Sequence, residues 1–112
     1  MKNLYHYYGN VVKVYDGDTI TVDIDLGFHI WMKSEKVRLY RINAPEIRGK
    51  QRPEGLKSRD WLREKILNKR VLLVTYKDKK GKYGRWLADI YLDDICLNDQ
   101  LVKEGLAVYK EY

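Results

Sequence analysis

Residues 11–24 read Val-Val-Lys-Val-Tyr-Asp-Gly-Asp-Thr-Ile-Thr-Val-Asp-Ile, and this stretch decides the fold class. The run Val11–Tyr15 is typical of a β-strand, and the following Asp16-Gly17-Asp18 is a turn signal. From Thr19 to Ile24, apolar and polar residues alternate strictly, which predicts an antiparallel strand with one buried and one solvated face. The stretch therefore predicts a hairpin at the start of a sheet.

The remaining sequence predicts more strands and two helices. Pro53 and Glu54 suit the first turn of a helix, which continues with an apolar stripe and stops at Asn68. A second, short helix is expected to start near Asn98 and to end near Gly105. The further expected strands cover residues 36–42, 71–76 and 85–92, with a basic turn at 77–84. Residues 106–109 are a candidate for one additional short strand.

Five short antiparallel strands with a helix after the third are typical of a small Greek-key barrel of the oligonucleotide-binding (OB) type. We therefore expect a mainly β (α+β) fold: a five-stranded antiparallel Greek-key barrel, a helix after strand 3 and a short C-terminal helix. A generic α+β sheet is the alternative. The length of 112 residues predicts one domain over residues 1–112.

Composition restricts the classes of function. The chain has 22 Lys and Arg against 16 Asp and Glu, a net charge of +6. This surplus favours a polyanionic partner such as nucleic acid, although a basic surface that only aids solubility is the alternative. A single cysteine, Cys96, excludes an internal disulfide and a cysteine-based zinc site.

The expected location and assembly follow from weaker signals. No apolar run approaches the roughly 20 residues of a membrane span, and no signal peptide is visible. We expect no membrane association and a cytoplasmic or intracellular location, with secretion as the alternative if a leader preceded this chain. A monomer is the default expectation.

Polar side chains gather at the ends of the expected elements, where sites are usually built. Each has an ordinary explanation as a turn residue or a solvated charge. Together they form a set that suits phosphodiester hydrolysis. Carboxylate and carboxamide oxygens hold a cation such as Ca²⁺, arginines bind phosphate oxygens, and a further carboxylate orients or deprotonates water. The residues are Asp18, Arg38, Asn43-Ala44-Pro45-Glu46 and Lys82-Tyr83-Gly84-Arg85.

Six motifs occur in an order that resembles the staphylococcal-nuclease-like (thermonuclease) family, from about Val11 to Tyr109. Each motif alone is common, and their order carries the resemblance. They are Val14-Tyr15-Asp16-Gly17-Asp18-Thr19, Val37-Arg38-Leu39, Asn43-Ala44-Pro45-Glu46, Lys82-Tyr83-Gly84-Arg85, Leu87-Ala88-Asp89-Ile90-Tyr91 and Leu101-Val102-Lys103-Glu104-Gly105-Leu106-Ala107.

The resemblance implies an OB-fold enzyme that cleaves DNA and RNA with Ca²⁺ and leaves 3′-phosphates. It implies that Asp18 and the backbone carbonyl of Ala44 are metal ligands, with Asp16 an acid just outside them. It implies that Arg38 and Arg85 clamp the phosphate and that Glu46 activates the attacking water, so these three are the implied catalytic residues. The implied nucleotide-binding residues are Lys82, Tyr83 and Tyr109.

The sequence departs from the family pattern at two of these places. Asn43 stands where the family usually has an aspartate, so its side-chain oxygen can still coordinate a cation but one negative charge is lost. Calcium affinity is expected to fall, because ligand charge tunes it. Trp86 stands where the family usually has a glycine after the second arginine.

The sequence leaves three functions open. The first is a Ca²⁺-dependent endonuclease acting on DNA or RNA with low sequence specificity. The second is a catalytically weak or inactive OB module that binds nucleic acid, an alternative that Asn43 keeps open. The third is a barrel that binds another protein and whose basic face is incidental.

Overall fold

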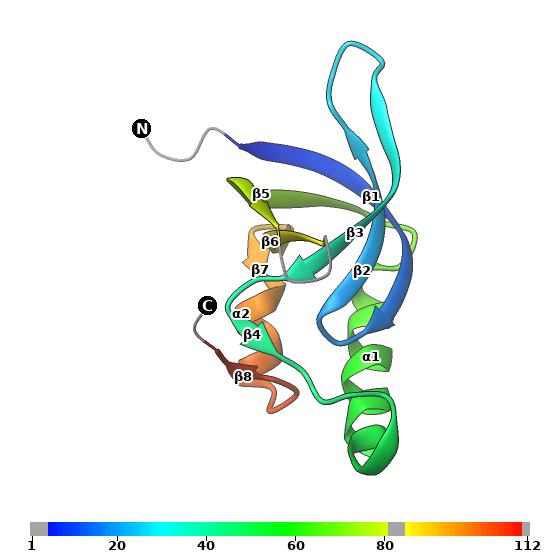
Figure 1. The fold of residues 1–112 in the computed structure, drawn as a ribbon, viewed down its shortest axis with the longest axis vertical. Coiled ribbons are helices and arrows are strands. Elements are labelled where there is room, and N and C mark those ends of the chain that lie inside the picture. The colour runs from blue at the N-terminus through cyan, green and yellow to red at the C-terminus, as the bar shows by residue number, and fades with distance from the viewer. Residues whose placement is uncertain (1–4, 81–84, 111–112) are drawn as a thin grey trace.

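The computed structural model describes residues 5–80 and 85–110. Within them a β-barrel carries two α-helices, and Figure 1 shows the longer helix below the turn between the first two strands. The elements are β1 (His6–Asp16), β2 (Thr19–Asp25), β3 (Trp31–Leu39), β4 (Ile42–Asn43), a 3₁₀ turn (Gly49–Gln51), α1 (Arg52–Ile66), β5 (Arg70–Lys80), β6 (Trp86–Leu92), β7 (Ile95–Cys96), α2 (Leu97–Lys103) and β8 (Val108–Tyr109).

Five strands close the barrel, which confirms the predicted OB-type fold. Strands β1, β2 and β3 form an antiparallel meander, β5 pairs antiparallel with β1, and β6 pairs antiparallel with β5. The ring closes through a parallel pairing of β3 with β6, which corrects the expectation of antiparallel pairing throughout. A ring with an odd number of strands cannot alternate direction all the way round, so at least one neighbouring pair has to run parallel.

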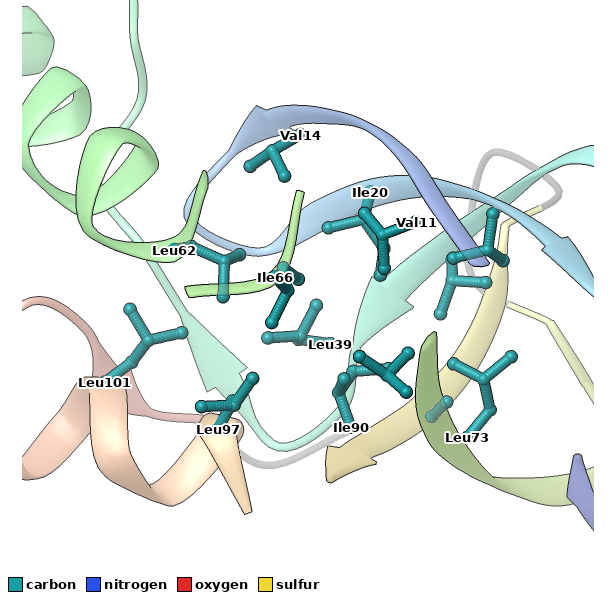
Figure 2. Packing of buried hydrophobic residues seen from close by; sticks show 14 of the residues in the cluster. Val11, Val14, Ile20, Leu39, Leu62, Ile66, Leu73, Ile90, Leu97 and Leu101 are labelled. Atoms are coloured by element: carbon teal, nitrogen blue, oxygen red, sulfur yellow. The ribbon is translucent and has the colours of Figure 1, made fainter. Parts of the chain in front are cut away.

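The core lies inside the barrel and continues between the barrel and the two helices (Figure 2). The predicted alternation is present: Ile20, Val22 and Ile24 of β2 are buried. Leu62 and Ile66, from the predicted apolar stripe of α1, are fully buried against the barrel, and Trp61 is partly buried. Each fully buried aliphatic side chain of this size contributes roughly 1.5–3 kcal/mol relative to an exposed one.

The third predicted strand was placed with the wrong limits. It begins at Trp31, five residues before the expected start, and it ends at Leu39. A turn follows because Arg41 has a φ of +70°, a left-handed conformation that no regular strand adopts. The chain then re-enters a two-residue strand, β4, that pairs antiparallel with β8, and this confirms the short strand expected at the end of the chain.

A buried polar network fixes the position of this turn. The Asn98 side chain, fully buried on α2, donates to the Tyr40 carbonyl (2.8 Å) and to Asp89 Oδ1 (3.0 Å). The Arg41 guanidinium pairs with Asp89 at 3.0 Å and with Asp99 at 3.2 Å. The network joins β6 and α2 to the turn that leads from β3 into the segment 42–46.

No helix in residues 5–80 or 85–110 combines the length and the apolar character needed to cross a bilayer.

The segment after β4 packs against the start of α1 through a glycine. A Cβ atom at Gly55 would overlap the carbonyl group of Glu46 and would lie 2.9 Å from the amide nitrogen of Ile47. The backbone of residues 46–47 therefore lies directly on the helix. A Glu46 amide that donates to Gln51 Oε1 at 3.1 Å adds a second attachment.

We predict that Gly55→Ala lowers the free energy of unfolding by about 1–3 kcal/mol, because the methyl group overpacks this contact. Alanine otherwise stabilises a helix interior by roughly 1 kcal/mol relative to glycine, so the sign of the change separates the two effects. Urea denaturation followed by circular dichroism measures it, with Lys57→Ala, an exposed position on the same helix, as the control. A stabilised Gly55→Ala variant would contradict the described contact.

Candidate active site

The turn between β1 and β2 presents the first candidate residue, Asp18. The Asp18 amide donates to Asp16 Oδ1 at 3.0 Å, a side-chain-capped turn that aspartate commonly forms. Between them, a Cβ atom on Gly17 would lie 2.7 Å from Ser58 Cβ and 2.8 Å from Ala44 Cβ. The turn is thus pressed against α1 and against the segment after β4, which brings Asp18 next to Ala44.

The Asp18 carboxylate is nearly enclosed and well supplied with donors. It is 6% exposed. Its Oδ2 accepts the Ala44 amide at 2.8 Å, and its Oδ1 accepts the Thr19 hydroxyl at 3.1 Å. Its Oδ2 also lies 3.5 Å from Nη2 of Arg38. A buried carboxylate stays charged only with such partners, so these contacts hold it in one orientation.

Arg38 lies on β3 directly opposite Thr19 of β2 and is 8% exposed. Its Nη1 donates to the carbonyls of Leu39 and Ile42, both at 2.9 Å. Its Nη2 donates to Asn43 Oδ1 at 3.2 Å and faces Asp18. The guanidinium group therefore bridges the end of β3, the strand β4 and the turn before β2.

Arg85 reaches the same place from the start of β6, the strand whose parallel pairing with β3 closes the barrel. The parallel register sets Val37 opposite Trp86 and Arg38 opposite Leu87, so Arg85 immediately precedes the paired stretch of β6. Its Nη1 donates to the Thr19 hydroxyl at 3.2 Å. The two arginines and Asp18, far apart in the sequence, thus all contact one another directly or through Thr19.

Thr19 is the residue at this site that the sequence analysis did not single out. Its hydroxyl accepts from Arg85 and donates to Asp18, which makes it the polar link between β2 and β6. One signal was available: in the alternating stretch 19–24 it stands on the polar face next to the turn, although it is 94% buried. A buried hydroxyl needs partners, and here both are charged.

The segment after β4 carries the other candidates. Asn43 is exposed and turns its Oδ1 toward Arg38. Ala44 is buried and held by its amide on Asp18. Glu46 is exposed, and its backbone is fixed by the contacts with Gly55 and Gln51 described above.

The expected nucleotide-binding residues are placed only in part. Lys82 and Tyr83 lie outside the described residues. Tyr109 is exposed on β8, and its hydroxyl donates to Asp99 Oδ1 at 2.9 Å. Strand β8 pairs with β4, and Val108 lies opposite Asn43. Tyr109 is the next residue of β8 and lies opposite Ile42.

The oxygen atoms of this site suit a hard cation bound with few protein ligands. Asp18 Oδ2 and Asn43 Oδ1 converge on one atom, Nη2 of Arg38, at 3.5 and 3.2 Å. Hence the two oxygens that the sequence analysis assigned to a metal do lie together, and a positive charge already faces both. No group of three or more His, Cys, Asp or Glu residues with metal-binding geometry occurs among the described residues. Water or a substrate phosphate would supply the remaining ligands, as is common for oxygen-binding cations.

Asp16, the second acid of this turn, is unfavourably placed for ionisation. Burial, and then the negative charge of Asp18, raise the pKa of Asp16 from 3.8 to about 7, although the positive charge of Arg38 opposes them. The site therefore contains an acid, Asp16, that titrates near neutrality. With two guanidinium groups beside the acids of this turn, the arrangement attracts an anion such as a phosphate diester.

Comparison with known proteins identifies the family of this chain. Residues 36–112 match the model of the family described as staphylococcal nuclease homologue. The chain is 35% identical to a thermonuclease of Staphylococcus hyicus and 37% identical to one of Staphylococcus intermedius; each comparison covers 91% of the chain and 59% of the relative. It is 40% identical to an uncharacterized endonuclease of Haemophilus influenzae, over 91% of the chain and 52% of that protein. The chain thus spans a little over half the length of these relatives, and the resemblance noted in the sequence is confirmed.

We predict that the free energy of unfolding of the metal-free protein contains a contribution from Asp16 that falls as pH rises from about 4 to about 7. The folded carboxyl keeps its proton up to about pH 7, whereas the unfolded one loses it near 3.8, so the folded state binds more protons in this window. Asp16→Asn should remove the decline. The difference in unfolding free energy between variant and parent should grow by up to a few kcal/mol from about pH 4 to about pH 8.

Urea denaturation in a chelator at several pH values measures this difference. Asp60→Asn, at an exposed carboxyl on α1, is the matched control. If the two asparagine variants show the same pH dependence, Asp16 is not destabilised when it ionises.

Proposed function

The chain belongs to the family of staphylococcal nuclease homologues, and we propose that it is a nuclease that hydrolyses phosphodiester bonds of DNA, RNA or both with low sequence specificity and leaves 3′-phosphates. The observation that carries the proposal is the meeting of Arg38, Arg85 and Asp18 around the Thr19 hydroxyl. These groups come from separate parts of the barrel, and two guanidinium groups beside one buried acid suit the binding of an anion such as a phosphate diester.

In the proposed reaction, Arg38 and Arg85 bind the scissile phosphate. Guanidinium groups form paired, charge-assisted hydrogen bonds with phosphate oxygens. Because negative charge accumulates on these oxygens as water attacks phosphorus, fixed N–H donors stabilise the transition state more than the ground state. Burial of Arg38 strengthens this effect, since surrounding protein replaces mobile water.

Glu46 is the proposed general base. The residue is exposed, and its backbone is held against α1 at Gly55, so its side chain is accessible to water beside the site. A carboxylate in this position would orient the attacking water and accept its proton. The proposal requires no histidine, serine or cysteine nucleophile.

We infer that the enzyme uses Ca²⁺, held by the Asp18 carboxylate, Asn43 Oδ1 and the Ala44 backbone carbonyl. A bound cation supplies positive charge next to the phosphate oxygens. Nη2 of Arg38 donates to Asn43 Oδ1 at 3.2 Å and lies 3.5 Å from Asp18 Oδ2. Arg38 would therefore exchange these acceptors for phosphate oxygens when the substrate binds.

A binding module without catalysis is the second candidate, and one observation favours it. Asn43 leaves the cation with a single carboxylate among its proposed protein ligands, and Arg38 neutralises that carboxylate at 3.5 Å. Such a site would hold a nucleic-acid backbone through its arginines even where the cation binds weakly. Binding without cleavage in the presence of Ca²⁺ would identify this function.

We predict that the protein degrades single-stranded DNA or RNA in Ca²⁺ and not in chelator. Arg38→Ala, Arg85→Ala and Glu46→Ala should each lower kcat/KM by about 100-fold or more, the usual loss when a transition-state donor or a general base is removed. Gel analysis of a labelled oligonucleotide, with identification of the product ends, measures cleavage.

The controls remove equal charges elsewhere: Arg70→Ala, at an exposed arginine on β5, and Glu64→Ala on α1. Equal losses in the controls would attribute the effect to net charge. Metal-independent cleavage, or full activity of both arginine variants, would overturn the proposed site.

A separate prediction concerns Asn43. Asn43→Asp adds a charged oxygen opposite Asp18, and we expect the Ca²⁺ concentration for half-maximal binding to fall by about an order of magnitude, because ligand charge sets the affinity of such sites. Isothermal calorimetry with Ca²⁺ alone measures this without reference to turnover. Asn68→Asp, in the loop after α1, is the matched control. An unchanged affinity would remove position 43 from the metal ligands.

A further inference from the structure

A second row of polar side chains runs beside the candidate site on the same face of the sheet. Thr19 of β2 stands opposite Asp16 of β1 and Arg38 of β3. Two residues further along β2, Thr21 stands opposite Lys13 and Lys36. Because side chains two residues apart in a strand point to the same face, the second row lies about 6–7 Å from the first.

The two rows border one hollow in the surface. It has a volume of about 310 Å³ and is lined by Lys13, Tyr15, Thr19, Thr21, Lys36 and Arg85. We call it the Lys13–Lys36 groove. Since Thr19 and Arg85 belong both to the groove and to the candidate site, the groove is an extension of that site along β2.

Charge and side-chain chemistry in the groove suit a phosphate. Lys13 and Lys36 are exposed, and within residues 5–80 and 85–110 neither forms an ion pair with a carboxylate. None of the described lining residues is acidic. Lysine and threonine side chains are common donors to the phosphates of nucleic acids. The solvated basic surface that the composition left as an alternative would not require the two lysines to flank a hydroxyl across three strands.

The border of the groove adds an aromatic ring. Tyr15 is exposed on β1, and its hydroxyl accepts from Nη2 of Arg48 at 3.2 Å. Arg48 belongs to the basic segment between β4 and α1. An exposed aromatic ring beside a positively charged groove is typical of surfaces that bind single strands by stacking and backbone contacts.

We propose that the Lys13–Lys36 groove binds a backbone phosphate of the same nucleic-acid strand next to the one cleaved, and so makes the protein favour strands over single nucleotides. The spacing of the rows is comparable to the separation of neighbouring phosphates in an extended strand. This proposal rests on the proposed function, because it places the cleaved phosphate between Arg38 and Arg85.

Binding in chelator tests the groove separately from catalysis. Fluorescence anisotropy measures the Kd of the full chain for a single-stranded DNA of about 16 nucleotides, a length within the range one OB fold covers. Lys13→Gln/Lys36→Gln should raise Kd roughly tenfold at low salt and reduce the slope of log Kd against log salt by about 1. Lys57→Gln/Lys103→Gln removes two exposed charges from the helices as the control, and Lys13→Arg/Lys36→Arg should keep most of the affinity.

The site of the contact is tested with modified strands. Oligonucleotides that carry one neutral methylphosphonate at successive positions should lose affinity for the parent protein at a position next to the cleaved linkage. The Gln/Gln variant should not show this loss, because the contact is already absent. In a cleavage assay, the fall in kcat/KM of that variant should be several-fold larger for the long strand than for a dinucleotide.

The outcomes separate the two proposals. If the parent binds the strand and the Gln/Gln variant binds more weakly, but nothing is cleaved in Ca²⁺, the groove stands and the nuclease proposal fails. If cleavage occurs and the Gln/Gln variant matches the Lys57→Gln/Lys103→Gln control in Kd and salt slope, the groove proposal is overturned. A parent that binds no single-stranded nucleic acid at low salt overturns both.

Discussion

Closure of a ring of five strands is the constraint on which the site depends. An odd ring has to contain a parallel pair, and here that pair is β3 with β6. In this pair the start of β6 lies against the last three residues of β3, with Val37 opposite Trp86, so the residue before β6 comes to lie near the end of β3. That residue is Arg85, and the register brings it to Thr19, which stands opposite Arg38. The seam of the barrel is therefore where two arginines distant in sequence meet.

The acids at this seam are held at an energetic cost. The Asp18 carboxyl group lies in a nearly enclosed position, which is tolerated because an amide, a hydroxyl and a guanidinium face it. Asp16 has fewer such partners, and burial, followed by the negative charge of Asp18, raises its pKa. Such destabilised groups are concentrated where proteins bind or transform ligands, since a cation or an anion that binds there relieves unfavourable electrostatics. A purely structural turn would gain stability from an uncharged residue at one of these positions.

Local rules accounted for much of this from the sequence. Alternation gave the buried face of β2, and the apolar stripe gave Leu62 and Ile66 of α1. What escaped prediction depends on contacts between distant segments. The end of β3 is set by Arg41, whose left-handed turn is fixed by Asp89 and Asp99. The parallel seam follows from the number of strands, a global property. The order of the motifs in the sequence indicated most of the site residues, but only the strand register explains why Thr19 lies among them.

The electrostatics of this face separate binding from hydrolysis. Four basic side chains lie around this site, and its acid Asp18 pairs with one of them, the Arg38 guanidinium. The four are Arg38, Arg85, Lys13 and Lys36. The face is thus positive before any cation binds, and long-range attraction to a polyanion needs no metal. In the proposed mechanism a cation serves the chemical step rather than recognition. On this proposal, the loss of a ligand charge at position 43 weakens catalysis first and leaves strand binding almost intact. A nuclease and a non-catalytic binding module would then share the surface that binds the strand and would differ in whether the proposed cation site is occupied.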